Sequence, residues 1–111
     1  MGRKKHKAPP FVMVRRDLLK DLTWRKLSNA AKVLYIYLRY KFDFKKVNSE
    51  VCLPYVEIKD MMSSKTVSRA FKELIGNQFI EKSVQGGLFK GMNKYKFVGE
   101  YKHFYYKGHK V

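Results

Sequence analysis

The stretch that decides the fold reads Ser63-Ser64-Lys65-Thr66-Val67-Ser68-Arg69-Ala70-Phe71-Lys72-Glu73-Leu74-Ile75-Gly76-Asn77. Its apolar residues follow the spacing i, i+3, i+4, i+7, i+8, which is typical of the buried face of an α-helix. These residues are Val67, Ala70, Phe71, Leu74 and Ile75. Serine favours the N-cap position, and Gly76-Asn77 supplies a stop because both residues tolerate the left-handed conformation that ends helices. The pattern predicts an amphipathic helix over Ser64–Asn77.

The residues after this helix have extended character. Phe79–Val84 predicts one strand, Gln85-Gly86-Gly87 is a turn signal, and a second extended stretch covers Tyr95–Val98. We therefore expect a β-hairpin packed behind the helix.

A second long helix is predicted earlier in the chain, with Ser28 as its N-cap. The apolar residues that follow recur at helical spacing: Ala31, Leu34, Tyr35, Leu38 and Phe42. Further apolar residues lie on its other faces: Val33, Ile36, Tyr37 and Tyr40. A helix with so wide an apolar surface is expected to be central and mostly buried.

Shorter elements are expected around these two helices. Phe11–Val14 is a β-prone run suited to a sheet edge, and Asp17–Leu22 predicts one or two helical turns with its three leucines against the core. Val51–Leu53 predicts one short strand. Pro54 suits the first turn of a helix over Tyr55–Met61. The expected apolar contacts of that helix are Val56, Ile58, Met61 and Met62.

The predicted order is helix, short strand, helix, tight turn, helix, β-hairpin. The segment Met61-Met62-Ser63-Ser64 has about the length of the sharp turn in a helix-turn-helix. The expected fold class is therefore α+β, a winged helix-turn-helix with a three-helix core and a C-terminal β-hairpin wing, over residues 11–98. Residues 1–10 are expected to form a basic flexible arm, and residues 99–111 an aromatic and basic tail.

Charge is the strongest global feature of the composition. Among 111 residues, 25 are Lys or Arg and 9 are Asp or Glu, so the formal net charge is +16. The like charges repel one another and destabilise the folded domain unless a polyanion is the usual partner. Nucleic acid is favoured as that partner over an anionic membrane surface or an acidic protein patch.

The longest apolar run, Val33–Leu38, is too short to span a membrane. A single cysteine, Cys52, is expected to be a small buried residue in a protein of the cytoplasm, associated with the nucleoid.

The outer face of the helix Ser64–Asn77 carries the candidate DNA-binding residues. They are Lys65, Thr66, Ser68, Arg69 and Lys72, with Glu73 as the one acid among them. Arg69 is expected to contact a base, because a guanidinium pairs bidentately with guanine. Lys65 and Lys72 are expected to bind phosphate, and the hydroxyl residues suit either contact. The N-terminal part of such a helix faces the base edges in helix-turn-helix docking.

The residues Ser63–Ile75 resemble the recognition helix "S-x-x-T-V-S-R-A-x-K-x-L" of bacterial winged-helix regulators. Asn77-Gln78-Phe79-Ile80 resembles the entry to the wing of that family, and Gly86-Gly87 with Lys94-Tyr95 resembles the hairpin. The part from Phe11 to Leu38 is similar to winged-helix proteins of phages, plasmids and other mobile elements. The resemblance implies duplex DNA binding in transcription regulation or in replication initiation. This sequence departs from the family pattern at two places. Gln78 stands where a glycine is usual, and Met62 or Ser63 stands where the turn often has a small residue.

Basic residues outside the helix are candidates for further contacts. In the wing, Lys82, Lys90 and Lys94 are expected to bind phosphate, the alternative being a solvated hairpin. The arm residues Arg3, Lys4 and Lys5 are possible DNA contacts, or else part of a solvated terminus. In the tail, aromatic residues from Tyr101 onward alternate with lysines; they suit packing on the domain, a homodimer contact or stacking on unpaired bases.

No catalytic set, cofactor motif, metal site or small-molecule site is evident in the sequence. His6, His103 and His109 have no metal-type spacing with Cys52, so we expect neither an enzyme nor a metal protein. Two alternatives to duplex DNA binding stay open at this point. One is a structural RNA-binding protein of the ribosomal type, and the other is a winged-helix module that binds an acidic protein.

Overall fold

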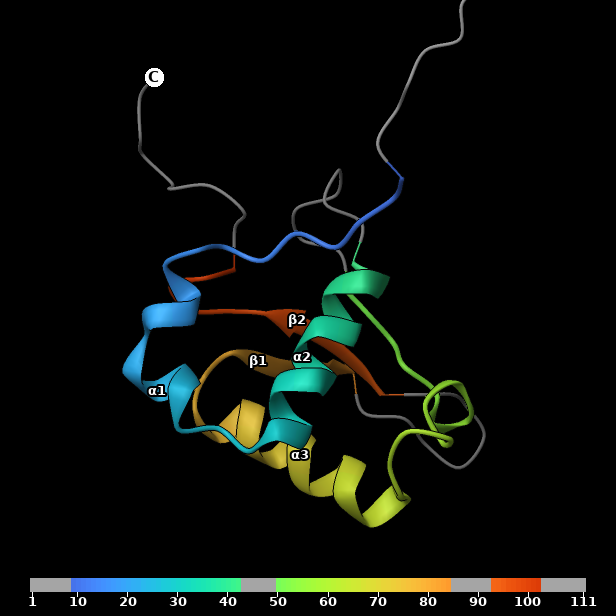
Figure 1. Ribbon diagram of the computed structural model, residues 1–111. Helices are drawn as coiled ribbons and strands as arrows, with labels where there is room; N and C mark the ends of the chain where they lie inside the picture. The colour runs from blue at the N-terminus through green and yellow to red at the C-terminus, as the bar shows by residue number, and fades with distance from the viewer. Residues whose placement is uncertain (1–8, 43–49, 85–92, 103–111) are drawn as a thin grey trace, which may run out of the picture.

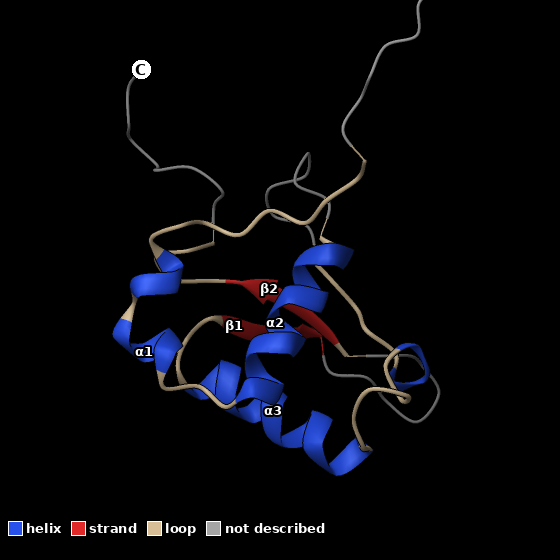
Figure 2. Ribbon diagram, in the orientation of Figure 1, coloured by secondary structure: helices blue, strands red, loops and turns tan. Residues whose placement is uncertain are grey.

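The computed structural model describes residues 9–42, 50–84 and 93–102. The described part forms a small α+β domain, with three α-helices and a two-stranded antiparallel sheet (Figures 1 and 2). The α-helices and strands are α1 (Leu22–Arg25), α2 (Asn29–Lys41), α3 (Ser64–Gly76), β1 (Ile80–Val84) and β2 (Lys94–Phe97). Two 3-10 turns, η1 (Leu18–Lys20) and η2 (Tyr55–Glu57), complete them. The α+β class is therefore confirmed, and the arrangement is compatible with a winged helix.

Both long helices begin where the sequence predicts. The Ser28 hydroxyl accepts a hydrogen bond from the Ala31 amide at 3.1 Å, and the Ser63 hydroxyl accepts one from the Thr66 amide at 3.2 Å. Each serine thus satisfies a backbone donor that has no partner inside its own helix.

The end of α3 differs from the prediction. Neither Gly76 nor Asn77 is left-handed, and the residue with positive φ is Gln78, at 63°. The Phe79 amide donates to the Leu74 carbonyl and the Gln78 amide to the Ile75 carbonyl. This is a Schellman motif, in which the second residue past the helix must be left-handed. Gln78 therefore occupies the left-handed position, where the winged-helix proteins that this sequence resembles usually have glycine.

The core lies between α2, α3 and the sheet. β1 pairs with β2 in a register that sets Ile80 opposite Phe97, and Val51 forms a single bridge to Tyr95 on the other side of β2. The predicted strand Val51–Leu53 is thus reduced to one bridge. At the centre, four aromatic rings meet edge to face: Trp24, Tyr35, Phe79 and Phe97.

Several predicted elements are wrong. Phe11–Val14 is not a strand, and the Phe11 side chain is 72% exposed. The segment Asp17–Leu22 does contain the predicted helical turn, as η1 and the start of α1, but of its three leucines only Leu18 is buried, whereas Leu19 and Leu22 are exposed.

The predicted helix Tyr55–Met61 consists of the single 3-10 turn η2 followed by irregular turns, and only Ile58 among its expected core contacts is fully buried. A segment this short cannot offset the cost of helix nucleation, and its β-branched residues disfavour the helix further.

Helix α2 is also less buried than expected. Its inner face is fully covered, whereas Val33, Ile36 and Tyr40 are exposed. In the described ranges, no helix combines the length and apolar character needed to cross a bilayer.

Candidate nucleic-acid interface

Helix α3 has one buried and one exposed face. Val67, Ala70 and Leu74 are buried in the contact with α2 and the core. The outer face carries four of the predicted residues, all exposed, at the spacing i, i+3, i+4, i+7: Lys65, Ser68, Arg69 and Lys72. The structure thus brings these four side chains to one side of one helix. Figure 1 shows α3 on the far side of the domain from the two ends of the coloured, described chain.

Thr66 has a second role at the start of the same helix. It is half-buried, and its hydroxyl accepts a hydrogen bond from the Ser63 hydroxyl at 3.1 Å. Its amide donates to the same serine. Thr66 therefore belongs to the N-cap of α3 as well as to the edge of the exposed face.

Glu73, the acid among these basic residues, is bound to the start of α2. Its carboxylate accepts hydrogen bonds from the Ser28 hydroxyl at 2.6 Å and from the Ser28 amide at 2.9 Å. In a capping box, a glutamate in the third position of the same helix accepts from the N-cap amide. Here that position holds Ala31, and Glu73 of α3 takes over the role. Sequence reasoning missed this contact, although an acid inside a basic face was a signal for it.

A groove lies between the start of α2 and the outer face of α3, with a volume of about 540 Å³. It is lined by Ser28, Ala30, Thr66, Arg69, Ala70, Lys72 and Glu73. Because Glu73 is already bonded to Ser28, the charged groups at its rim that remain to face a partner are the cations Arg69 and Lys72. The groove therefore extends the basic face of α3 toward α2.

The hairpin adds further exposed cations. Lys82 of β1 and Lys94 of β2 are both exposed, and Lys94 lies opposite Val84 in the sheet register. The other wing candidate, Lys90, and the arm candidates Arg3, Lys4 and Lys5 lie outside the described residues.

A buried arginine holds the segment that follows β2. Arg39 is 5% exposed, and its guanidinium lies 3.8 Å from the centre of the Phe97 ring. It donates to the Tyr35 hydroxyl at 3.1 and 3.2 Å and to the carbonyl of Tyr101. Burial lowers the pKa of Arg39 and raises that of the Tyr35 phenol. Arg39 thus joins α2 to the chain beyond β2.

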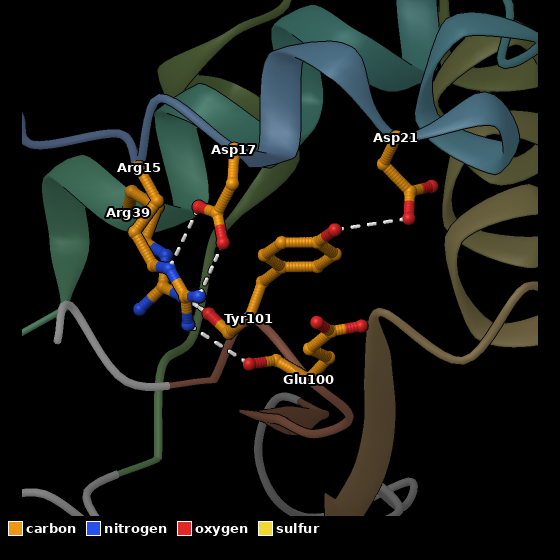
Figure 3. Close-up of polar contacts among 6 residues, drawn as sticks. All are labelled: Arg15, Asp17, Asp21, Arg39, Glu100 and Tyr101. Atoms are coloured by element: carbon orange, nitrogen blue, oxygen red, sulfur yellow. Dashed lines mark hydrogen bonds and ion pairs between the residues drawn. The ribbon is translucent and has the colours of Figure 1, made fainter. Parts of the chain in front are cut away.

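Whereas Arg39 binds the carbonyl of Tyr101, residues near the N-terminus contact its side chain (Figure 3). Its hydroxyl donates to the Asp21 carboxylate at 3.0 Å, and its ring stacks on Phe79. Arg15 lies 5.0 Å from the ring centre and donates to the Glu100 carbonyl at 2.9 Å. Partial burial, with the hydrogen bond to Asp21, raises the pKa of Tyr101 to about 12. The first aromatic residue of the predicted tail therefore packs on the domain itself; residues 103–111 lie outside the described part.

Over residues 9–42, 50–84 and 93–102, no group of three or more His, Cys, Asp or Glu side chains is placed to hold a metal ion. Cys52 is half-buried, contrary to the expectation of a fully buried residue. Comparisons with protein-family models, with curated proteins and with solved structures found no match to this chain.

Proposed function

We propose that this chain binds double-stranded DNA, with α3 in the major groove and the β1–β2 hairpin along the backbone. The observation that carries the proposal is the outer face of α3, where Lys65, Arg69 and Lys72 are exposed on one side. The acid of that helix, Glu73, is bonded to Ser28. Such a face presents cations and hydroxyl groups to a polyanion, and its one carboxylate, that of Glu73, is bonded to Ser28.

The roles of the residues follow from their chemistry. Arg69 pairs bidentately with a guanine edge, and Ser68 donates to a base or a phosphate. Lys65 and Lys72 bind phosphates on the two sides of the groove, and Lys82 and Lys94 of the hairpin add phosphate contacts. The net charge of +16 supplies affinity that does not depend on sequence, through the release of counterions from DNA.

As the sequence resemblance implies, the protein uses this binding in transcription regulation or in replication initiation of a mobile element. Its place would be the cytoplasm, in association with the nucleoid.

The test is selection of bound duplexes from a random pool at stated salt, followed by footprinting and affinity measurement. We expect Arg69→Ala to cost about 1–3 kcal/mol on the selected site and to relax the base preference at one position. Lys72→Ala should weaken all duplexes alike and reduce the salt slope by about one. Lys20→Ala is the matched control, because it removes the same charge from the exposed turn η1, which lies apart from α3 in Figure 1.

Two results would contradict the proposal. One is a selection that yields no preferred duplex, with Arg69→Ala and Lys20→Ala equivalent. The other is tighter binding to structured RNA than to any duplex DNA at the same salt, which would favour a ribosomal-type role. A steep salt dependence for DNA with no acidic protein partner recovered would count against the protein-interaction alternative.

A further inference from the structure

The hairpin and α3 meet at a pair of stacked aromatic rings. Tyr95 of β2 is 6% exposed, and the centre of its ring lies 4.4 Å from that of Phe71 on α3, with 16° between the two planes. Aromatic pairs favour a few defined geometries. The contact therefore sets an orientation between α3 and β2 as well as a distance.

The main chain of Tyr95 is held from both sides. On one side it lies opposite Lys82 of β1 in the sheet register. On the other side its amide donates to the Val51 carbonyl at 2.8 Å, and the Val51 amide donates to its carbonyl at 2.7 Å. Its hydroxyl accepts a hydrogen bond from the Asn93 side chain at 3.3 Å. Because the main chain is fixed, the stack of the ring ties the position of the hairpin to that of α3.

The stack lies at one edge of the exposed face of α3. With 3.6 residues per turn, Phe71 and Glu73 lie at opposite edges of that face. The edge with Glu73 is bonded to Ser28 of α2, so the edge with Phe71 is the one toward the hairpin. Residues three apart are neighbours on a helix surface, so the exposed Ser68 lies next to Phe71.

The sheet register places Lys82 on the side of the hairpin that faces α3. Residues directly opposite each other in an antiparallel pair project from the same face of the sheet. Lys82 therefore projects from the face on which the Tyr95 ring meets α3, and its side chain is exposed. Lys94, the residue before Tyr95, projects from the opposite face. Of these two cations, Lys82 is the one on the α3 side.

We propose that Tyr95 is a positioning residue for DNA binding. Its stack on Phe71 holds Lys82 beside the exposed face of α3, so that the helix and the hairpin bind one duplex together. The inference rests on the proposed function, because it concerns how the two elements share a duplex. A hairpin that is already held in place loses little conformational freedom on binding, whereas the ordering of a loose one opposes binding. Two elements in a fixed relation also act as one multivalent surface.

The salt dependence of binding to a duplex from the selected pool measures the Lys82 contact. Lys82→Ala should reduce the salt slope of the wild type by about one, as expected for one lost phosphate contact. In a Tyr95→Leu background the same substitution should leave the slope unchanged, because Lys82 is no longer held at the phosphate. Tyr95→Phe keeps the ring, so it should preserve the effect of Lys82→Ala. Lys20→Ala is the matched control and should leave the slope unchanged in every background.

Melting temperatures measured beside each titration separate positioning from folding. Should Tyr95→Leu not fold, Phe71→Leu removes the other ring of the stack and is expected to have the same effect. The positioning role is overturned if Lys82→Ala leaves the wild-type slope unchanged, or reduces it equally in the wild type and in both leucine variants. If Arg69→Ala still relaxes the base preference in that case, the proposed function stands. A wild type that prefers no duplex overturns both.

Discussion

Replacing Glu73 with alanine removes the two hydrogen bonds through which a side chain of α3 caps the first turn of α2. The carboxylate accepts two hydrogen bonds from Ser28, at 2.6 and 2.9 Å. It also places a negative charge at the N-terminus of a helix, where the helix dipole is positive. The substitution therefore removes a cap and a charge together, without opening a cavity in the core.

The size of the effect follows from these contacts. Hydrogen bonds to charged groups contribute about 1.5–3 kcal/mol each when buried. This pair is exposed, so water replaces much of what is lost, and we expect Glu73→Ala to lower the free energy of unfolding by about 1–2 kcal/mol. For a domain of this size, each kcal/mol corresponds to a fall of about 4–8 °C in melting temperature.

Urea unfolding of four proteins tests the reasoning: wild type, Glu73→Ala, Ser28→Ala and the double variant. Because both single changes remove the hydrogen bond from the Ser28 hydroxyl to the Glu73 carboxylate, the double variant should be more stable than their sum implies, by about 1 kcal/mol. Glu81→Ala, which removes an exposed acid from β1, is the matched control and should change stability by less than about 0.5 kcal/mol. Additive effects of Ser28→Ala and Glu73→Ala, or a stability of Glu73→Ala equal to that of the control, would refute the proposed cap.

Three further predictions concern the turn and the buried arginine. Gln78→Gly should stabilise the protein by about 0.5–1 kcal/mol in chemical unfolding, since φ is 63° there; a loss would mean that the Gln78 side chain matters more than its backbone. Arg39→Met should cost about 2–4 kcal/mol, because it leaves buried acceptors at Tyr35 and Tyr101 without a donor; a stability equal to wild type would contradict this. Tyr101→Phe should remove one component of the alkaline loss of stability. The folded state raises the pKa of this phenol from 10.0 to about 12, so its contribution is complete below pH 10 and is lost as the pH rises toward 12. Unfolding of wild type and Tyr101→Phe at pH 8 and pH 11 should show the difference between them shrinking with pH, and a constant difference would contradict the assignment.

The long amphipathic segments could be predicted because their information is local. The caps Ser28 and Ser63, the start of α3 and its buried face all follow from residues within a few positions of each other. The outer face of α3 was predictable for the same reason, since a helix with a known inner face has a known outer one. Short elements were not predictable on this basis: the segment Tyr55–Met61 carries apolar residues at suitable positions, yet it is too short to form a helix on its own.

What the sequence by itself determined is therefore the two long helices, the hairpin strands and the basic surface of α3, because periodicity, capping and charge act over one or two turns. The tertiary structure alone decided which polar side chains join parts of the chain that are distant in sequence. Glu73 caps a helix by bonding to its N-cap residue Ser28, 45 residues earlier, and Arg39 binds the Tyr101 carbonyl 62 residues later. It also decided that Val33, Ile36 and Tyr40 stay exposed, because the inner face of α2 alone meets α3 and the core. Such contacts depend on how the helices pack, and no local pattern encodes the partner that packing brings near.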